Sequence, residues 1–189
     1  MNTSLTLTQL AQAKALAPAF LAELGLHNLE HGGVGIPYYD ESGKELLVKR
    51  RTAVRAGDGS FWPRGQPLRP YGLWKLAEAR QSGFLLLVEG ESDCWALWRH
   101  GVPALGLPGC DAARALLHEH LREVKLVYVH REPDQGGERF VAGLVRRLTE
   151  LGYGGQVHEL TLPTGIKDLA DLHDLQPPAF LHTVYADIG

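Results

Sequence analysis

The spacing of apolar residues changes along this chain and divides it into blocks. Over residues 8–26 apolar side chains recur every three or four positions, which predicts a helix that ends at Gly25 and that Pro18 divides or kinks. Two strand-like runs then flank a polar turn at residues 40–43, a pattern typical of a β-hairpin. Glycine and proline accumulate over residues 57–72, so we expect that segment to be irregular.

Short apolar runs alternate with helical patterns from residue 73 onward. This alternation predicts an α/β fold, with a mostly parallel sheet flanked by helices and a small N-terminal α+β subdomain. The expected domains are residues 1–80 and 81–189, the second ending in a short helical tail. We expect strands at residues 84–88, 102–109, 125–130 and 156–162, and helices at residues 73–81, 92–100, 111–123 and 138–151.

Acidic side chains follow three of the predicted strands. The stretch LLLVEGESD places Glu89, Glu91 and Asp93 directly after a buried strand. Because ligands bind at the carboxyl ends of the strands in such sheets, we expect the acidic groups to converge. Clustered carboxylates repel one another unless a cation neutralises them, and oxygen ligands suit Mg²⁺ or Mn²⁺. The other acidic residues of this kind are Glu132, Asp134, Asp168, Asp171 and Asp174.

Each acidic group also has a plainer interpretation. Glu91 and Asp93 would be favoured at the start of a helix in any protein, because the helix dipole attracts negative charge there. Asp168 could cap a short helix, and Glu132 and Asp134 could be ordinary polar residues of a loop. The occurrence of all three groups after strands favours a common site.

Composition restricts the class of protein. The chain has 189 residues, of which 44% are hydrophobic and 22% are charged, as in ordinary globular proteins. No apolar run approaches the roughly 18 residues of a membrane span, and no signal segment is visible, so we expect a cytoplasmic protein without membrane contact. The cysteines, Cys94 and Cys110, form no CxxC pair, and no zinc site is expected.

Charge is distributed unevenly along the chain. Residues 44–80 carry nine Lys or Arg against three Asp or Glu, a net charge of +6. Residues 81–189 carry nine Lys or Arg against fifteen Asp or Glu, a net charge of −6. The first block could attract a polyanion and the second could hold cations, although solvated surface charge would give the same counts.

Residues 82–175 resemble the Toprim domain of bacterial primases, topoisomerases and some nucleases. The resemblance lies in LLLVEGESD, ALGLPG and LVYVHREPDQGGERF. Glu89 and Asp93 match the EGxxD setting of the family, and Glu132 and Asp134 match its DxD pair, with Glu in place of the first Asp. The resemblance implies catalytic roles for Glu89, Glu132 and Asp134, and a metal site that Asp93 and Asp168 complete.

The sequence before this domain is similar to the primase branch of the family. GVGIPYYDESGKELLVKRR and FWPRGQPLRPYGLWKLAEAR resemble the subdomain that precedes Toprim in bacterial and phage primases. Basic and aromatic side chains there would contact phosphates and bases, although Trp62 and Tyr71 could equally close a small core. The implied nucleic-acid and nucleotide contacts are Lys49, Arg50, Arg51, Trp62, Arg64, Tyr71 and Lys75.

The resemblance predicts a primase-type protein that binds single-stranded DNA and joins nucleoside triphosphates with Mg²⁺ or Mn²⁺. The chain has no Cys/His set for the zinc module of such primases and no GxxxxGK[ST] loop of a fused helicase. A helicase or a separate template-recognition protein is therefore an expected partner, as for a mobile-element protein or a piece of a longer chain. The alternatives are a Toprim nuclease that activates water and a non-catalytic binding module, which Glu132 favours.

Overall fold

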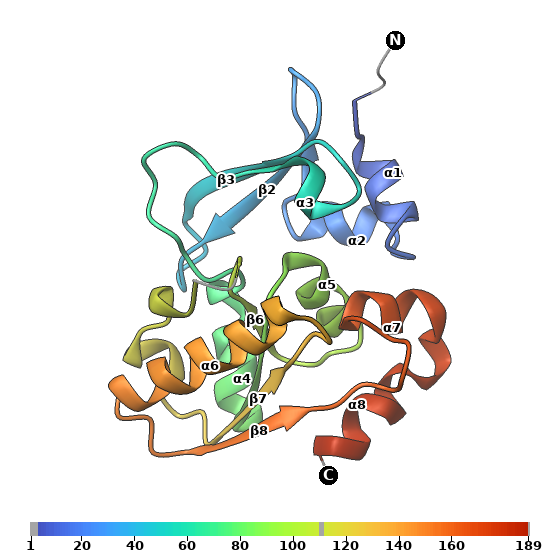
Figure 1. Cartoon of the computed structure of the whole chain (residues 1–189). Helices are drawn as coiled ribbons and strands as arrows, with labels where there is room; N and C mark the ends of the chain where they lie inside the picture. The colour runs from blue at the N-terminus through green and yellow to red at the C-terminus, as the bar shows by residue number, and fades with distance from the viewer. Residues whose placement is uncertain (1–3, 110–111, 189) are drawn as a thin grey trace. The chain divides into compact units, whose positions relative to one another are not determined.

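The chain divides in sequence into two units, Met1–Pro67 and Leu68–Gly189. The structure, a computed structural model, describes residues 4–109 and 112–188 (Figure 1). The sequence placed the boundary after residue 80, whereas the segment 68–80 belongs to the second unit, where its leucines enter the core. Within the described residues, no helix combines the length and the apolar character that a membrane span requires.

The first unit combines short helices with an antiparallel sheet. The helix expected over residues 8–26 is divided, because Ala15 has a positive φ of 50° and Pro18 starts a new helix. Among the described residues, the helices are α1 (Leu7–Gln12), α2 (Pro18–Glu23) and α3 (Ala56–Gly59). The strands, in sheet order, are β1 (His27–Asn28), β2 (Val34–Tyr39), β3 (Glu45–Arg51) and β4 (Ser60–Phe61).

The hairpin of β2 and β3 forms where the sequence predicted it. Oδ1 of Asp40 accepts hydrogen bonds from the backbone N–H groups of Ser42 and Lys44, at 2.9 and 3.0 Å. Gly43 has a φ of 82°, which glycine adopts without steric cost. The polar residues of the turn therefore satisfy their own backbone and set the pairing of the two strands.

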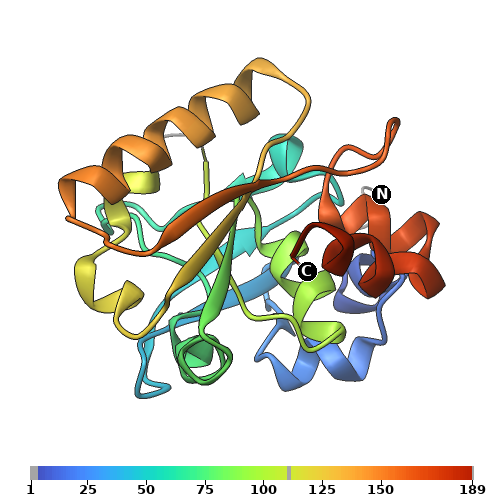
Figure 2. The same ribbon diagram turned by 90° about the horizontal axis from the view of Figure 1, so that it is seen from below.

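A parallel sheet forms the centre of the second unit. Figure 2 shows α6 (Gln135–Glu150) on one face of this sheet and α5 (Glu91–Arg99), α7 (Leu169–Leu175) and α8 (Phe180–Ile188) on the other. The predicted fold class, a mostly parallel sheet flanked by helices, is confirmed. In the described part of the chain, the strand order is β6 (Ala104–Gly106), β5 (Phe84–Val88), β7 (Leu126–His130) and β8 (Gln156–Leu160). The shorter elements are η1 (Leu73–Lys75), α4 (Leu76–Ser82) and η4 (Pro177–Ala179).

Alternate positions of β5 and β7 pack against α6. Successive side chains of a strand point to opposite faces, so every second residue reaches the same layer. The buried residues of α6 are three or four apart and form one stripe along the helix. This packing holds α6 along the sheet and thereby positions the loop that joins β7 to α6. The buried residues concerned are Leu85, Leu87, Val127, Val129, Phe140, Leu144 and Leu148.

The prediction of a helix over residues 111–123 is wrong. Short 3₁₀ turns, η2 (Ala112–Ala115) and η3 (His118–Leu121), occupy this stretch, and its first residue lies outside the described residues. Leu117, between the turns, has an extended backbone, and its N–H donates to Nδ1 of His120 at 3.1 Å. This local hydrogen bond replaces one that a continuous helix would make.

Candidate active site

The strand-end carboxylates come together at one edge of the parallel sheet. β5 and β7 are adjacent and parallel, so the residues that follow them leave the sheet side by side. Glu89 follows β5, whereas Glu132 and Asp134 follow β7. The carboxyl group of Glu89 is close enough to the other two for their charges to raise its pKa. The structure therefore assembles these residues into one group, called here the acidic cluster.

The pKa of Glu89 is raised above that of an ordinary glutamate. Partial burial is the largest cause, and the negative charges of Glu132 and Asp134 add to it. The positive charges of Lys167 and Arg139 act in the opposite direction. A carboxyl group in such surroundings takes up a proton or a cation more readily than an exposed one.

Lys167 forms an ion pair with the acidic cluster. Its Nζ lies 2.9 Å from Oε2 of Glu132, whose side chain is only 15% exposed. The hydrogen bond to Glu132 is the largest cause that raises the pKa of Lys167, and the charges of Asp168 and Asp134 contribute. Lys167 therefore supplies positive charge next to the carboxylates of the acidic cluster. The sequence analysis did not single it out, although it directly precedes Asp168.

Asp134 caps the N-terminus of α6. Its Oδ1 accepts a hydrogen bond from the N–H of Gly137 at 2.9 Å, and the backbone bonds from Gly137 and Gly136 lower the pKa of Asp134. A Cβ atom on Gly137 would lie 2.6 Å from the backbone nitrogen of Glu132. Glycine is therefore required here, because the helix begins against the backbone of the loop that carries Glu132.

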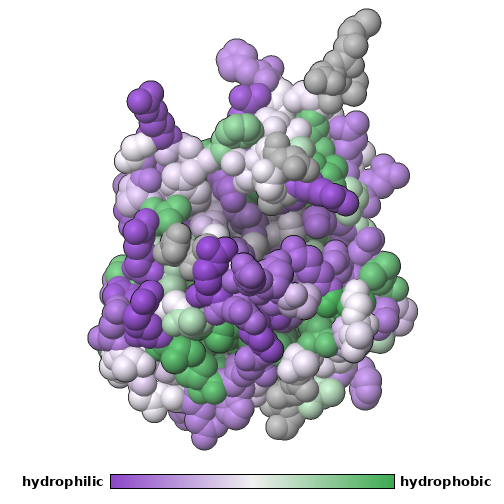
Figure 3. Space-filling model, in the orientation of Figure 1, coloured by the Kyte–Doolittle hydropathy of each residue, from purple (hydrophilic) through white to green (hydrophobic). Residues whose placement is uncertain are grey.

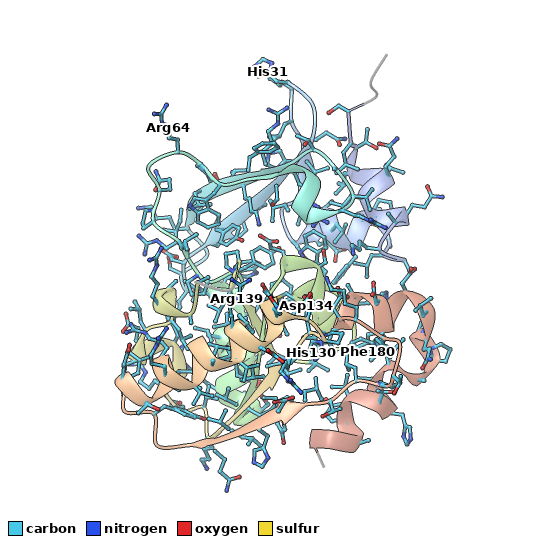
Figure 4. The ribbon with its side chains drawn as sticks, viewed as in Figure 1. His31, Arg64, His130, Asp134, Arg139 and Phe180 are labelled. Atoms are coloured by element: carbon cyan, nitrogen blue, oxygen red, sulfur yellow. The ribbon has the colours of Figure 1, made fainter. Side chains whose placement is uncertain are left out.

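His130, the last residue of β7, fixes the loop that carries Lys167. The imidazole is buried, and its Nε2 lies 3.1 Å from the backbone oxygen of Lys167. Its Nδ1 lies 3.3 Å from the backbone oxygen of Leu160. These contacts tie the chain after β8 to the end of β7, near the loop of Asp134 (Figure 4). His130 thus positions Lys167, and the sequence analysis missed it, because only the fold brings the two together.

Asp93 and Asp168 have structural roles next to the acidic cluster. Asp93 is 5% exposed, and its Oδ1 accepts a hydrogen bond from the N–H of Ala170 at 3.1 Å, which joins α5 to α7. Asp168 caps α7, and its Oδ1 accepts a hydrogen bond from the N–H of Asp171 at 2.8 Å. The bond of Asp168 matches the capping interpretation weighed against metal binding, whereas the bond of Asp93 runs to a helix other than its own. Asp168 also lies close enough to Lys167 to raise its pKa.

The donor chemistry of the acidic cluster suits a hard divalent cation, because carboxylate oxygens are the usual protein ligands of Mg²⁺ and Mn²⁺. Within the described residues, however, no group of three or more His, Cys, Asp or Glu side chains is spaced to hold a metal ion. The ion pair with Lys167 engages Glu132, and the helix cap engages Asp134. A cation would therefore have to compete with Lys167 for Glu132.

A cavity of about 550 Å³ opens next to the acidic cluster. Glu132 and Asp134 line it from the loop after β7, and Glu159 lines it from β8. Nε of Arg131 lies 2.7 Å from Oε1 of Glu159 at its wall. This volume falls in the range of pockets that hold small molecules. Two carboxylates of the acidic cluster, Glu132 and Asp134, therefore face a space in which a small ligand can lie.

Several of the residues predicted to contact nucleic acid are accessible. Arg64 is exposed and extends from the first unit (Figure 4). Arg50 is also exposed, and its Nε donates to the backbone oxygen of Gly32 at 3.1 Å. Trp62 is partly exposed. In the second unit, Lys75 is partly exposed and its Nζ lies 5.5 Å from the ring centroid of Trp98.

Other predicted contacts lie in the interior. Arg51 is 2% exposed and donates to the backbone oxygens of Ala53 and Val54, so the predicted surface contact is wrong for this residue. Its guanidinium holds the loop after β3 instead. Lys49 is buried as well, at 8% exposure. Counting charges along the sequence could not separate these two residues from their exposed neighbours.

Tyr71 is an interior residue of the second unit. It is fully buried, and its hydroxyl accepts a hydrogen bond from Nε1 of Trp95 at 2.9 Å. Its ring centroid lies 5.2 Å from those of Trp74 and Trp98. The prediction that Tyr71 stacks on a base is therefore wrong, and the alternative, that it closes a core, holds.

Comparison with solved structures identifies the class of fold. A DnaG catalytic core aligns with a TM-score of 0.67 and 17% identity, over 95% of this chain and 72% of that one. A DnaG primase catalytic domain bound to single-stranded DNA aligns with a TM-score of 0.65 and 18% identity, over 95% and 73%. The RNA polymerase domain of Mycobacterium tuberculosis primase DnaG gives 0.67 and 15%, over 95% and 74%. No protein-family model and no curated protein matches the sequence.

The chain therefore has the fold of a primase catalytic core that contains a Toprim domain. The alignments cover both units, which confirms the resemblance to the primase branch drawn from residues 34–80 and 82–175. At identities of 15–18%, this likeness establishes the architecture.

Proposed function

We propose that this protein is a primase-type nucleotidyltransferase that builds short oligonucleotides on single-stranded DNA. The main support is the acidic cluster, which lies at neighbouring strand ends of a primase catalytic-core fold. A half-buried glutamate with a raised pKa beside two further carboxylates costs stability. Such an arrangement is typical of a site that binds a cation or moves a proton.

The side chains of the cluster have distinct proposed tasks. Glu89, Glu132 and Asp134 would hold Mg²⁺ or Mn²⁺. When bound, such a cation positions the triphosphate and offsets charge on the attacking and leaving oxygens. Asp134 stays ionised, because backbone bonds lower its pKa. Glu89 has an alternative role, since its raised pKa suits it to exchange a proton instead of holding the cation.

Lys167 would act as a counter-ion that gives way to the cation. In the structure described, it neutralises Glu132 and is held at its backbone by His130. Release of its Nζ from Glu132 would leave a mobile ammonium group within reach of a phosphate oxygen. The same loop would therefore stabilise the empty site and contact the loaded one.

Single-stranded DNA and nucleoside triphosphates are the proposed substrates. One of the structural neighbours is described as bound to single-stranded DNA. In this chain, Arg50 and Arg64 offer exposed positive charge, and Trp62 offers a partly exposed ring. A helicase or a separate template-recognition protein is the proposed partner.

Incubation of the protein with single-stranded DNA, labelled nucleoside triphosphates and Mg²⁺ or Mn²⁺ tests this proposal. New short oligonucleotides are the expected product. A shortened template without new product would instead identify a nuclease that uses the same carboxylates. A bound but unchanged template would identify a binding module. Parallel reactions with ribonucleotides and deoxyribonucleotides would determine which of the two is joined.

A further inference from the structure

A second cavity, also of about 550 Å³, lies in the second unit along α6 and η2. Four of the described arginines line it, and we call it the arginine groove: Arg114 from η2, and Arg139, Arg146 and Arg147 from α6. It shares no lining residue with the cavity at the acidic cluster. The sequence analysis expected the positive surface of this protein in residues 44–80 and did not predict this groove.

The groove follows from the residue spacing in α6. Positions three, four, seven and eight apart lie on one side of a helix, so Arg139 shares a stripe with Arg146 and Arg147. Ala142 and Gly143 lie between them and are small, which leaves a hollow between the longer side chains. The neighbouring stripe of the helix is buried against the sheet, so the arginine stripe stays at the surface.

Positive charge is concentrated here within a negative part of the chain. Residues 81–189 carry nine Lys or Arg against fifteen Asp or Glu, yet four of those nine line this groove, and among the described lining residues only Glu150 is acidic. Glu150 pairs with Arg147 at 3.3 Å. Figure 3 shows hydrophilic side chains next to hydrophobic ones over the region that α6 occupies in Figure 1. The distribution therefore favours an anionic ligand at this face.

The arginines differ in how firmly they are held. Nε of Arg147 donates to the backbone oxygen of Leu116 at 2.9 Å, which fixes its position between α6 and the segment after η2. Arg114 and Arg146 are exposed, and no hydrogen bond or ion pair engages either guanidinium group within the described part of the chain. Nε of Arg139 donates to the backbone oxygen of Gln135 at 3.3 Å. The groove thus combines two arginines that are engaged with two that are available to a ligand.

The groove begins near the acidic cluster. Arg139 lies close enough to Glu89 and Asp134 to lower the pKa of both. Figure 4 shows Arg139 and Asp134 at the same end of α6. Arg146 follows seven residues later, about 10 Å further along the helix at 1.5 Å per residue. A row of positive charges of this length that leads away from the acidic cluster matches a chain of phosphates better than a single one.

We propose that the arginine groove binds the phosphodiester backbone of a single nucleic-acid strand that enters or leaves the acidic cluster. This assignment rests on the proposed function for its biological meaning. The lining residues are arginines, small residues and one glutamate, without an aromatic ring for base stacking among those described. Recognition is therefore by phosphate charge and is independent of base sequence.

The test compares two variants that each lose two exposed positive charges. Arg114→Gln with Arg146→Gln removes the two available guanidinium groups of the groove. Arg122→Gln with Lys125→Gln is the matched control, because both of these residues are exposed in the second unit and outside the groove. Fluorescence anisotropy with labelled oligo(dT) and oligo(dA), in EDTA and over a range of salt, measures binding without nucleoside triphosphates or divalent cations.

The groove variant should bind both oligonucleotides more weakly than wild type. Its plot of log affinity against log salt should be shallower by about 1.4, since each lost phosphate contact reduces the slope by about 0.7 for single strands. The control should keep the wild-type slope. Equal slopes in both variants, or a wild-type protein that binds neither oligonucleotide, would overturn the proposal.

Two further outcomes test the kind of ligand and the proposed function independently of each other. Competition by ATP that is as strong as competition by an oligonucleotide, with no dependence on oligonucleotide length, would show a nucleotide site and overturn the assignment of a strand. Because binding is measured without catalysis, a protein that makes no product but shows the expected slope change would retain the groove and lose the proposed function.

Discussion

At the scale of single residues, the pair of Glu132 and Lys167 places a positive charge against an enclosed carboxylate of the acidic cluster. Glu132 is almost enclosed, and an enclosed carboxylate is costly unless a positive charge accompanies it. Lys167 supplies that charge at 2.9 Å and also opposes the rise in the pKa of Glu89. The same pairing implies competition between Lys167 and any cation that Glu132 binds.

Replacement of Lys167 by Gln should therefore strengthen cation binding. Removal of one positive charge from the vicinity of a divalent ion should raise the affinity for Mn²⁺ about tenfold, on the scale of a screened Coulomb interaction. Titration calorimetry on the nucleotide-free protein measures this. Lys125→Gln, which removes an equal charge from an exposed position, is the control and should bind as wild type. Unchanged affinity in Lys167→Gln would mean that the lysine does not compete.

The carboxylate of Glu132 should matter more than the length of its side chain. Glu132→Asp restores the common family pattern and should keep substantial nucleotidyl-transfer activity. Glu132→Gln keeps the shape, removes the charge and should lose activity about a hundredfold or more, the scale of deleting a key electrostatic group. Initial rates of oligonucleotide synthesis give the comparison. A fully active Gln variant would leave Asp134 as the only ligand after β7.

The raised pKa of Glu89 predicts a pH-dependent cost to stability. The folded protein binds a proton at Glu89 at higher pH than the unfolded chain does. The resulting stabilisation is complete below the unfolded pKa and is lost as the pH rises through the folded pKa. Glu89→Gln should therefore melt at a higher temperature than wild type near about pH 8 and at an equal temperature near about pH 4.

Thermal unfolding in EDTA across that pH range checks this expectation. Glu119→Gln, a change at an exposed position of η3, should show no such trend. A difference between wild type and Glu89→Gln that stayed constant with pH would contradict the raised pKa.

The sequence predicted which acidic side chains come together better than it predicted which basic side chains are exposed. Glu89, Glu132 and Asp134 could be placed because strand ends in a parallel sheet share one edge, which is a rule about backbone topology. Burial could not be read in the same way. Arg51 and Tyr71 look like surface residues in a basic, aromatic segment, and only the fold shows that their polar groups bond to Val54 and Trp95.

At the scale of elements, α6 links the parts of the site. Its N-terminus is capped by Asp134, its buried stripe packs on the sheet, and its arginine stripe forms the groove. The sequence predicted this helix and the strands on either side of it, because their apolar periods are regular. It failed at residues 112–121, where apolar residues have helical spacing but Leu117 is held extended by a bond to His120.

Gly137→Ala tests whether the N-terminus of α6 packs directly against the backbone of Glu132. The added Cβ would meet the backbone of Glu132 at 2.6–2.8 Å, and a backbone cannot rotate away. We expect a loss of about 1–3 kcal/mol in the free energy of unfolding, the usual cost of overpacking. Gly136→Ala is the matched change, because its Cβ would meet only the side chain of Asp134, at 2.9 Å. Denaturant unfolding that ranked the two variants equally would contradict this account of the loop.

At the scale of the whole molecule, the chain has a primase catalytic-core fold at identities where general sequence similarity no longer identifies relatives. The likeness in fold covers both units. A fold can be shared at such low identity because packing tolerates many apolar sequences. The sequence did not predict the boundary at Pro67, because the apolar residues that follow Tyr71 could pack in either unit.

The central claim is that the acidic cluster joins nucleotides, and a product assay on matched variants tests it most directly. Wild type, Glu89→Gln and Glu119→Gln would be incubated with single-stranded DNA, labelled nucleoside triphosphates and Mn²⁺, and the products separated by length. We predict short oligonucleotides from wild type and Glu119→Gln, about a hundredfold less from Glu89→Gln, and none in EDTA. Equal synthesis by wild type and Glu89→Gln, or none by any of the three proteins, would contradict the claim.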